Sequence, residues 1–165
     1  MSLLTKLTRA WLTRSFQPFT FKNKYDTKLA FAECEGLDLY VHIPFCRQLC
    51  SFCPYCKELY NAKVCGEYID HLIQEIHIVG SQLTEKKHVT SLYFGGGTPA
   101  LAAGRIGEIV AAIQEHFIIS EGIGLELHPD NVNGETLTVL RSAGVSKTSI
   151  GIQSFGDKYL SILGR

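Results

Sequence analysis

The sequence lacks an excess of charge of either sign. Its 165 residues carry 16 Lys and Arg against 16 Asp and Glu, which gives a formal net charge of zero at pH 7. Proteins that bind nucleic acid or an acidic membrane surface usually show a surplus of basic side chains. We therefore expect no nucleic-acid partner and no association driven by an acidic surface.

Long hydrophobic runs are also missing. No stretch of the sequence reaches the roughly 20 apolar residues that cross a bilayer. The beginning of the chain, MSLLTKLTRAWLTRSF, carries its charges too evenly for a secretory signal. Apolar residues make up 45% of the chain, which excludes general disorder and suffices for a buried core. We expect a soluble, cytoplasmic chain without a membrane partner, in a compartment that keeps thiols reduced.

A third absence concerns the six cysteines. Four of them, Cys46, Cys50, Cys53 and Cys56, lie close together, and no second pair follows at the spacing typical of structural zinc sites. Thiolates are soft ligands that select zinc, copper(I) or iron–sulfur clusters. The C-x3-C-x2-C spacing can hold three corners of a cubic cluster and leave one iron open, so we favour iron–sulfur over zinc. Cys56 remains open as a fourth ligand, a spare thiol or a structural residue.

From residue 37 onward, short apolar runs alternate with amphipathic stretches. The predicted strands are residues 37–43, 89–94, 123–127 and 147–152. The predicted helices span about residues 66–79, a segment with Ile106, Ile109, Val110, Ile113 and Phe117 on one face, a segment from Asn133 to Gly144, and residues 157–163. This alternation predicts an α/β fold with a parallel sheet and right-handed crossovers.

Residues 1 to 36 precede this pattern as an N-terminal segment. Its apolar side chains recur at helical spacing, at Leu3, Leu4, Leu7, Trp11 and Leu12. We expect a short helix there, and we favour a helix that packs on the domain or frays over one that lies on a membrane.

Polar features follow each predicted strand. The cysteines come after the first strand, the run Gly95-Gly96-Gly97-Thr98-Pro99 after the second, Glu126 near the end of the third and Gln153 after the fourth. Ligands of parallel sheets bind beyond the carboxyl ends of the strands, so we expect these features to form one site. Taken alone, the glycine run is either a plain turn or a backbone cradle for a ligand. It lacks the lysine of a phosphate-binding P-loop.

The stretch YVHIPFCRQLCSFCPYC resembles the cluster loop of radical S-adenosylmethionine enzymes. In detail it is similar to the oxygen-independent coproporphyrinogen III oxidase subfamily, whose members carry a Y-x-H-I-P-F-C-x3-C-x-F-C run. The resemblance covers about residues 38 to 165. It implies that Cys46, Cys50 and Cys53 ligate a [4Fe-4S] cluster and that S-adenosylmethionine chelates the open iron. It argues against Cys56 as a fourth ligand.

The resemblance also assigns the contacts of the cofactors. Tyr40 and Phe52 would lie against them, and Gly96, Gly97 and Thr98 match a GGTP motif that holds the methionyl end of S-adenosylmethionine. Glu126 would contact the nucleoside. The stretch AGVSKTSIGIQSFGDKYLSILGR resembles the fourth strand and helix of the family, which places Gln153 and Arg165 near S-adenosylmethionine.

The activity implied by the resemblance is reductive cleavage of S-adenosylmethionine to methionine and a 5′-deoxyadenosyl radical. In coproporphyrinogen oxidases this radical starts the oxidative decarboxylation of tetrapyrrole propionates in haem biosynthesis, with electrons from a flavodoxin or ferredoxin type of donor. No catalytic side chain is assigned beyond the cluster site. Two other hypotheses stay open, namely a haem or tetrapyrrole-binding chaperone and a zinc-stabilised domain without enzymatic activity.

The sequence also predicts how many strand–helix units the chain contains. Radical S-adenosylmethionine domains are typically partial (β/α) barrels of six units, whereas this chain contains four strand–helix starts. We therefore expect a partial barrel of this type, truncated after about four units, in which residues 37–165 form the N-terminal part of the core domain. The polypeptide alone should show little or no turnover, and robust S-adenosylmethionine cleavage by it would contradict this expectation.

Overall fold

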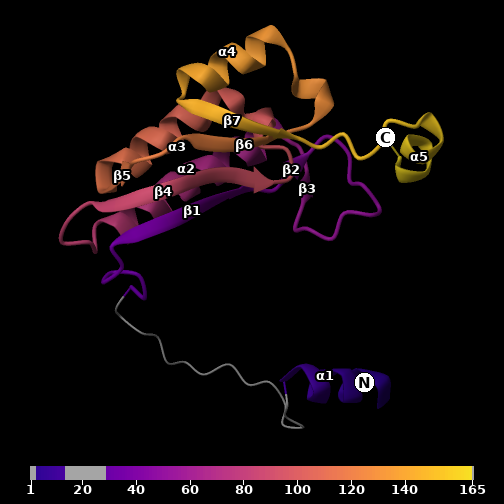
Figure 1. Cartoon of the computed structure of the whole chain (residues 1–165), viewed down its shortest axis with the longest axis horizontal. Helices are drawn as coiled ribbons and strands as arrows, with labels where there is room; N and C mark the ends of the chain where they lie inside the picture. The colour runs from indigo at the N-terminus through magenta and orange to yellow at the C-terminus, as the bar shows by residue number, and fades with distance from the viewer. Residues whose placement is uncertain (1–2, 14–28, 165) are drawn as a thin grey trace.

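The computed structural model describes residues 3–13 and 29–164 of the chain (Figure 1). The helices in these ranges are α1 (Leu3–Thr13), α2 (Ala62–Gly80), α3 (Ala103–His116), α4 (Gly134–Ser142) and α5 (Asp157–Leu163). The strands are β1 (Gly36–Ile43), β2 (Phe45–Cys46), β3 (Glu58–Leu59), β4 (Lys87–Gly96), β5 (Phe117–Ile119), β6 (Ile123–Leu127) and β7 (Val145–Ile150).

The main sheet is parallel and has the order β1-β4-β6-β7, with β5 paired to the beginning of β4. Within the described residues β1 and β7 form its two edges, so the sheet stays open rather than closing into a barrel. The helices α2, α3 and α4 follow one another along a single face of this sheet (Figure 1). The prediction of a parallel α/β fold, present as part of a barrel, is confirmed.

The hydrophobic core lies between the sheet and these helices. Alternate residues of β1 and β4 point into it, among them Ile43, Leu92 and Phe94, which are fully buried. The residues between them lie on the open face, where Tyr40 of β1 stacks on Tyr93 of β4 with ring centroids 6.5 Å apart. The open face is therefore lined by aromatic and polar side chains rather than by core residues.

Three predicted boundaries were wrong, each for a local reason. The helix expected from about Gly66 begins at Ala62, because the Asn61 side chain caps it by accepting the N–H groups of Lys63 and Val64. Phe117 is buried but does not belong to α3; it begins β5. The fourth main strand spans 145–150 rather than 147–152, directly after a turn at Gly144 with φ +91°.

The remaining helices are present as predicted, but the expected packing of the N-terminal helix on the domain was wrong. Asn133 caps α4, accepting the Thr136 N–H at 2.9 Å, and α5 spans residues 157–163 as expected. The helix expected near the N-terminus is α1, whose apolar side chains Leu3, Leu4, Leu7 and Trp11 are exposed rather than packed on the domain. The side chain of Leu12 lies outside the described residues.

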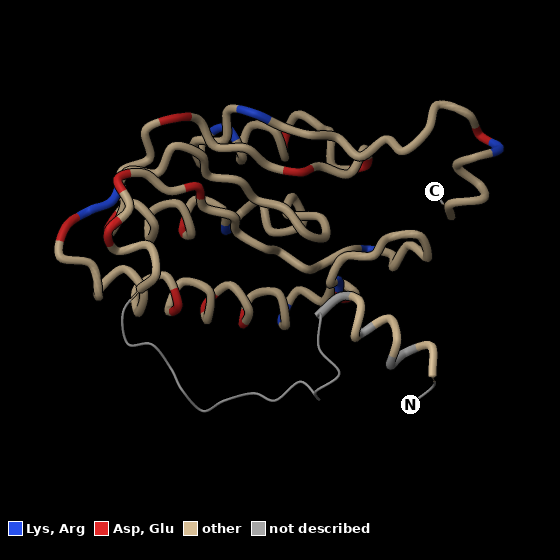
Figure 2. The backbone as a smooth tube through the Cα atoms, turned by 60° about the horizontal axis from the view of Figure 1, so that its bottom comes forward, with Lys and Arg blue, Asp and Glu red and all other residues tan. Residues whose placement is uncertain are grey.

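Between residues 29 and 164, Asp and Glu are more frequent than Lys and Arg, and acidic positions follow one another along parts of the backbone (Figure 2). None of the helices in the described ranges combines the length and the apolar character that crossing a membrane requires.

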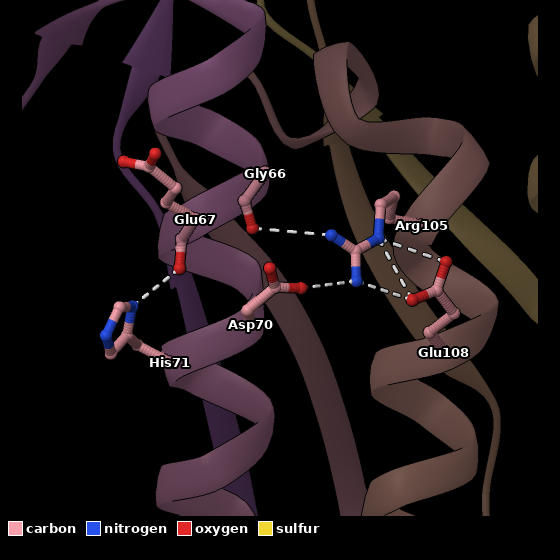
Figure 3. A network of polar contacts seen from close by, with 6 residues as sticks. All are labelled: Gly66, Glu67, Asp70, His71, Arg105 and Glu108. Atoms are coloured by element: carbon pink, nitrogen blue, oxygen red, sulfur yellow. Dashed lines mark hydrogen bonds and ion pairs between the residues drawn. The ribbon is translucent and has the colours of Figure 1, made fainter.

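One polar network links α2 to α3 on the outer surface (Figure 3). The Arg105 guanidinium of α3 donates to Asp70 at 2.8 Å, to the Gly66 carbonyl at 3.3 Å and to both carboxylate oxygens of Glu108. Glu108 and then Asp70 raise the pKa of Arg105 through these bonds. The network fixes the first turns of both helices, which lie next to the loops at the carboxyl edge of the sheet.

Candidate functional site

A cavity of about 410 Å³ opens at the carboxyl edge of the sheet. Nine residues singled out from the sequence line it: Cys46, Cys50, Phe52, Cys53, Gly96, Gly97, Thr98, Glu126 and Gln153. They come from four separate strand ends, as the topology of a parallel sheet requires. The structure therefore brings the cysteine loop, the glycine turn and the two strand-end polar residues into one site.

The cysteine loop is closed at its base by a short strand pair. Cys46 ends β2, which pairs with β3, and its carbonyl accepts the Tyr60 N–H at 2.8 Å. The Glu58 N–H donates to the Pro44 carbonyl at 2.8 Å. These bonds tie the two ends of the loop together, and Cys46, Cys50 and Cys53 border the same cavity.

The glycine turn is joined directly to this base. The Gly97 N–H donates to the Ile43 carbonyl at 2.8 Å, and the Thr98 N–H donates to the Phe45 carbonyl at 2.7 Å. A Cβ atom at Gly97 would lie 2.6 Å from the Phe45 carbonyl oxygen, which is closer than side-chain atoms approach backbone. Gly97 is therefore required by backbone contact with the cysteine segment, and Gly96 beside it adopts a φ of +113°.

The thiol of Cys46 lies in a partly buried position. Burial raises the pKa of this thiol, while the Thr98 hydroxyl and the Lys57 ammonium act in the opposite direction. The Thr98 hydroxyl lies 3.9 Å from the sulfur and donates to it. A hydroxyl donor and a nearby cation both favour the thiolate, which is the form that binds metal.

Lys57 is a site residue that the sequence reasoning missed. Its ammonium donates to the carbonyl oxygen of Cys50 at 2.7 Å and also to that of Cys53. It thereby ties together the turn that carries Cys50 and Cys53, and its positive charge acts on the thiol of Cys46. The available signal was its position directly after the cysteine run, but contacts to carbonyl oxygens leave no pattern in a sequence.

Glu126 connects β6 to the glycine turn. Its carboxylate accepts the Gly96 N–H at 3.3 Å and borders the cavity. Tyr40 does not line the cavity and is 59% exposed on the open face of the sheet. Burial of part of the ring, followed by the Glu126 carboxylate, raises the pKa of Tyr40. Tyr40 is thus a neighbour of the site rather than part of its wall.

Gln153 borders the cavity in an unusual conformation. Its φ of +70° makes it the single non-glycine residue with positive φ among the described residues. Such strain concentrates at functional sites, where surrounding contacts hold it. Arg165, the other C-terminal residue singled out from the sequence, lies outside the described residues.

Cys56 and His42 contact each other outside the cavity. Cys56 is exposed and does not line the cavity. Its carbonyl accepts a hydrogen bond from His42 Nε2 at 3.1 Å, and the His42 carbonyl accepts the Tyr68 hydroxyl at 2.7 Å. His42 therefore links the end of β1 to the cysteine loop through its ring and to α2 through its backbone carbonyl.

Comparisons with known proteins agree on one family. A sequence profile of the radical SAM superfamily, named for S-adenosylmethionine, matches residues 40–165. The oxygen-independent coproporphyrinogen III oxidase of Pseudomonas aeruginosa is 34% identical over 125 residues, which cover 72% of this chain and 27% of that protein. The heme chaperone HemW of Lactococcus lactis is 33% identical over 129 residues, covering 76% of this chain and 33% of the relative.

A solved structure gives the same result for the fold. Coproporphyrinogen III oxidase (HemN) from Escherichia coli, described as a radical SAM enzyme, aligns with a TM-score of 0.71 and 33% identity. The alignment covers 79% of this chain and 31% of that protein. The chain thus spans about a third or less of the length of the relatives it matches.

Proposed function

The chain belongs to the radical SAM superfamily, and from this premise we propose that it holds a [4Fe-4S] cluster and binds S-adenosylmethionine in the cavity at the carboxyl edge of its sheet. Cys46, Cys50 and Cys53 would be the protein ligands of the cluster. The observation that carries the proposal is that these three cysteines share one cavity with the glycine turn.

The donor set fits this group. Three thiols converge on the cavity, and the donor types suit iron–sulfur chemistry. The fourth cysteine of the run, Cys56, does not line the cavity, which matches a cluster with one iron left for a small molecule. The volume of about 410 Å³ lies in the range of small-molecule pockets.

When bound, the cluster supplies the electron that cleaves a carbon–sulfur bond of S-adenosylmethionine and so starts radical chemistry on a substrate. The contribution of the protein is binding and orientation. Gly96, Gly97 and Thr98 would hold the methionyl end of the cofactor, where the absence of two Cβ atoms admits a ligand close to the backbone. Glu126 would accept hydrogen bonds from ribose hydroxyls while it anchors Gly96.

Four further residues complete the proposed contacts. Phe52 on the cysteine loop and Gln153 after β7 both border the cavity. Tyr40 would contact the cofactors from the open face. Arg165 is proposed from its place in the sequence alone.

For the reaction we propose oxidative decarboxylation of tetrapyrrole propionates, as the name of the P. aeruginosa relative suggests. The electron would come from a flavodoxin or ferredoxin type of donor. A haem-binding chaperone role is the second candidate, because a relative of that name is 33% identical, almost as similar as the oxidase. Both candidates share the cluster site and differ in what happens to the tetrapyrrole.

The test is anaerobic reconstitution of the chain with iron and sulfide. We expect about four irons and four sulfides per chain, as a [4Fe-4S] cluster contains, and S-adenosylmethionine binding that depends on the cluster. Formation of 5′-deoxyadenosine under reducing conditions supports the oxidoreductase. Haem binding supports the chaperone, whereas a lack of 5′-deoxyadenosine alone does not, because little turnover is expected of this polypeptide. A single zinc without sulfide would refute the cluster itself.

Substituting Lys57 should loosen the proposed cluster without removing a ligand. The Lys57→Met variant loses two charge-assisted bonds to the carbonyl oxygens of Cys50 and Cys53. The loss of about 1.5 kcal/mol from such partly exposed bonds corresponds to roughly a tenfold faster release of iron to a chelator. Lys63→Met is the matched control. The Lys63 side chain is 85% exposed on α2 and pairs with Glu67 of the same helix, not with the cysteine loop. Equal release from both variants would contradict the role of Lys57.

A further inference from the structure

A second group of metal-binding side chains lies at the opposite edge of the sheet. His77 belongs to the last turn of α2, and Glu115 and His116 end α3. Because each helix runs back along the parallel strands, these ends lie where the strands begin, away from the cysteine loop. Figure 1 shows this separation, with the end of α3 beside β5 and the cysteine loop between β2 and β3 at the other side. The radical SAM site does not use these residues.

The potential ligand atoms are already close together. His77 Nδ1 lies 3.0 Å from His116 Nε2 and 3.7 Å from Glu115 Oε2, and all three ligand atoms fall within 4.8 Å of one another. In tetrahedral zinc sites, bonds of about 2.0–2.1 Å put neighbouring ligand atoms roughly 3.3 Å apart. Small rotations of the side chains would therefore place the three atoms around one ion.

The close contact with Gly80 at the end of α2 restricts the position of the His116 ring. The His116 imidazole lies directly over Gly80, the last residue of α2, where any Cβ atom would collide with the ring. The two imidazoles meet edge to face, with an interplanar angle of 74°. A glycine at this position thus lets the end of α3 approach the end of α2 closely enough for the two histidines to share a ligand.

The helix ends also favour a cation electrostatically. Both α2 and α3 end at this group, so the negative ends of two helix dipoles lie near it. Glu115 adds a carboxylate, and its side chain is 64% exposed, while that of His77 is 42% exposed. The group is therefore accessible to an ion and to a water molecule from solvent.

We propose that His77, Glu115 and His116 form a zinc site that links the ends of α2 and α3, with water as the fourth ligand. Two histidines and one glutamate are a known ligand set for zinc with an open fourth position. Imidazole nitrogen and carboxylate oxygen suit this ion, whereas the thiols at the other edge suit iron–sulfur chemistry. The two sites thus differ in place and in the chemistry of their ligands.

The test must keep zinc away from the cysteine loop. The starting protein, called the parent, is the full-length chain in which Cys46, Cys50 and Cys53 are replaced by serine. It is titrated with zinc chloride, and binding is measured by calorimetry. We expect it to bind one equivalent through the His77 group. Adding His77→Gln should lower this affinity by at least about tenfold, because even indirect partners of a metal site often contribute that much.

Two more variants make the result specific. Glu115→Gln changes an exposed side chain, so it should weaken zinc binding without affecting the fold, even if His77→Gln unfolds. His71→Gln is the matched control on α2, where His71 bonds the Glu67 carbonyl at 2.7 Å, and it should leave zinc affinity unchanged. Cys34, Cys56 and Cys65 are present in the parent and in every variant. A difference in zinc affinity between these proteins therefore comes from the substituted residue.

Thermal unfolding gives a second readout. Zinc should raise the midpoint of the parent and should raise it much less for His77→Gln and Glu115→Gln, since a ligand stabilises the state that binds it. Equal zinc affinity and equal midpoint shifts in the parent and both variants would overturn the proposal. The histidines would then be a hydrogen-bonded pair only. Because the parent lacks the cluster cysteines, either outcome is independent of the proposed radical SAM function.

Discussion

Replacing Cys46 by serine is expected to abolish the iron–sulfur cluster. Cys46 is the thiol best fixed by its surroundings, because its carbonyl closes the loop with Tyr60 and its sulfur accepts the Thr98 hydroxyl. Serine keeps the shape of the side chain and should leave these backbone bonds in place. With one of three protein ligands lost, we expect iron and sulfide after anaerobic reconstitution to fall at least about tenfold.

The matched control for this prediction is Cys56→Ser. Cys56 belongs to the same run of cysteines but is exposed and does not line the cavity. Its contact with His42 is made by the backbone carbonyl, which a serine retains. The variant should therefore keep its full content of iron and sulfide. Loss of the cluster in Cys56→Ser together with its retention in Cys46→Ser would refute the proposed ligand set. Circular dichroism of both apo variants checks that the fold is unchanged.

The architecture around this site could be predicted because it follows from local patterns. Runs such as residues 123–127 are apolar and short, and the parallel sheet that they imply orders its strand ends on one edge. Gly97, Glu126 and Gln153 therefore reach a common cavity although they lie far apart in the chain. The spacing of the cysteines added the chemistry of the ligands. Neither inference needed any long-range contact to be known.

Other features could not be predicted because they arise only when segments meet. The bonds of Lys57 to loop carbonyls depend on how the loop folds back, which no spacing rule describes. The strand that begins at Phe117 is short and continues an amphipathic helix, so its apolar residues looked helical. The pair formed by His77 and His116 joins two helix ends that are 39 residues apart. Gly80 ends α2 and lets His116 approach closely, a contact that leaves no pattern in the sequence.

Replacing Gly97 by alanine is expected to destabilise the fold strongly. The added Cβ would lie 2.6 Å from the Phe45 carbonyl oxygen and 2.7 Å from the Pro44 carbonyl carbon, so backbone rather than a flexible side chain must move. We expect the free energy of unfolding to fall by about 2–3 kcal/mol, the upper range for overpacking a close contact. The displaced segment carries Cys46, so the proposed cluster should be lost as well.

Gly104→Ala provides a control with the opposite sign. Gly104 lies in the first turn of α3, and a Cβ atom there would meet nothing within 4 Å. Alanine in place of this glycine should stabilise the fold by up to about 1 kcal/mol, since it lowers the entropy of the unfolded chain. Urea unfolding of the apo chain measures both variants. A Gly97→Ala protein as stable as Gly104→Ala would mean that the glycine turn and the cysteine segment are not in contact, and the shared cavity on which the functional proposal depends would have to be abandoned.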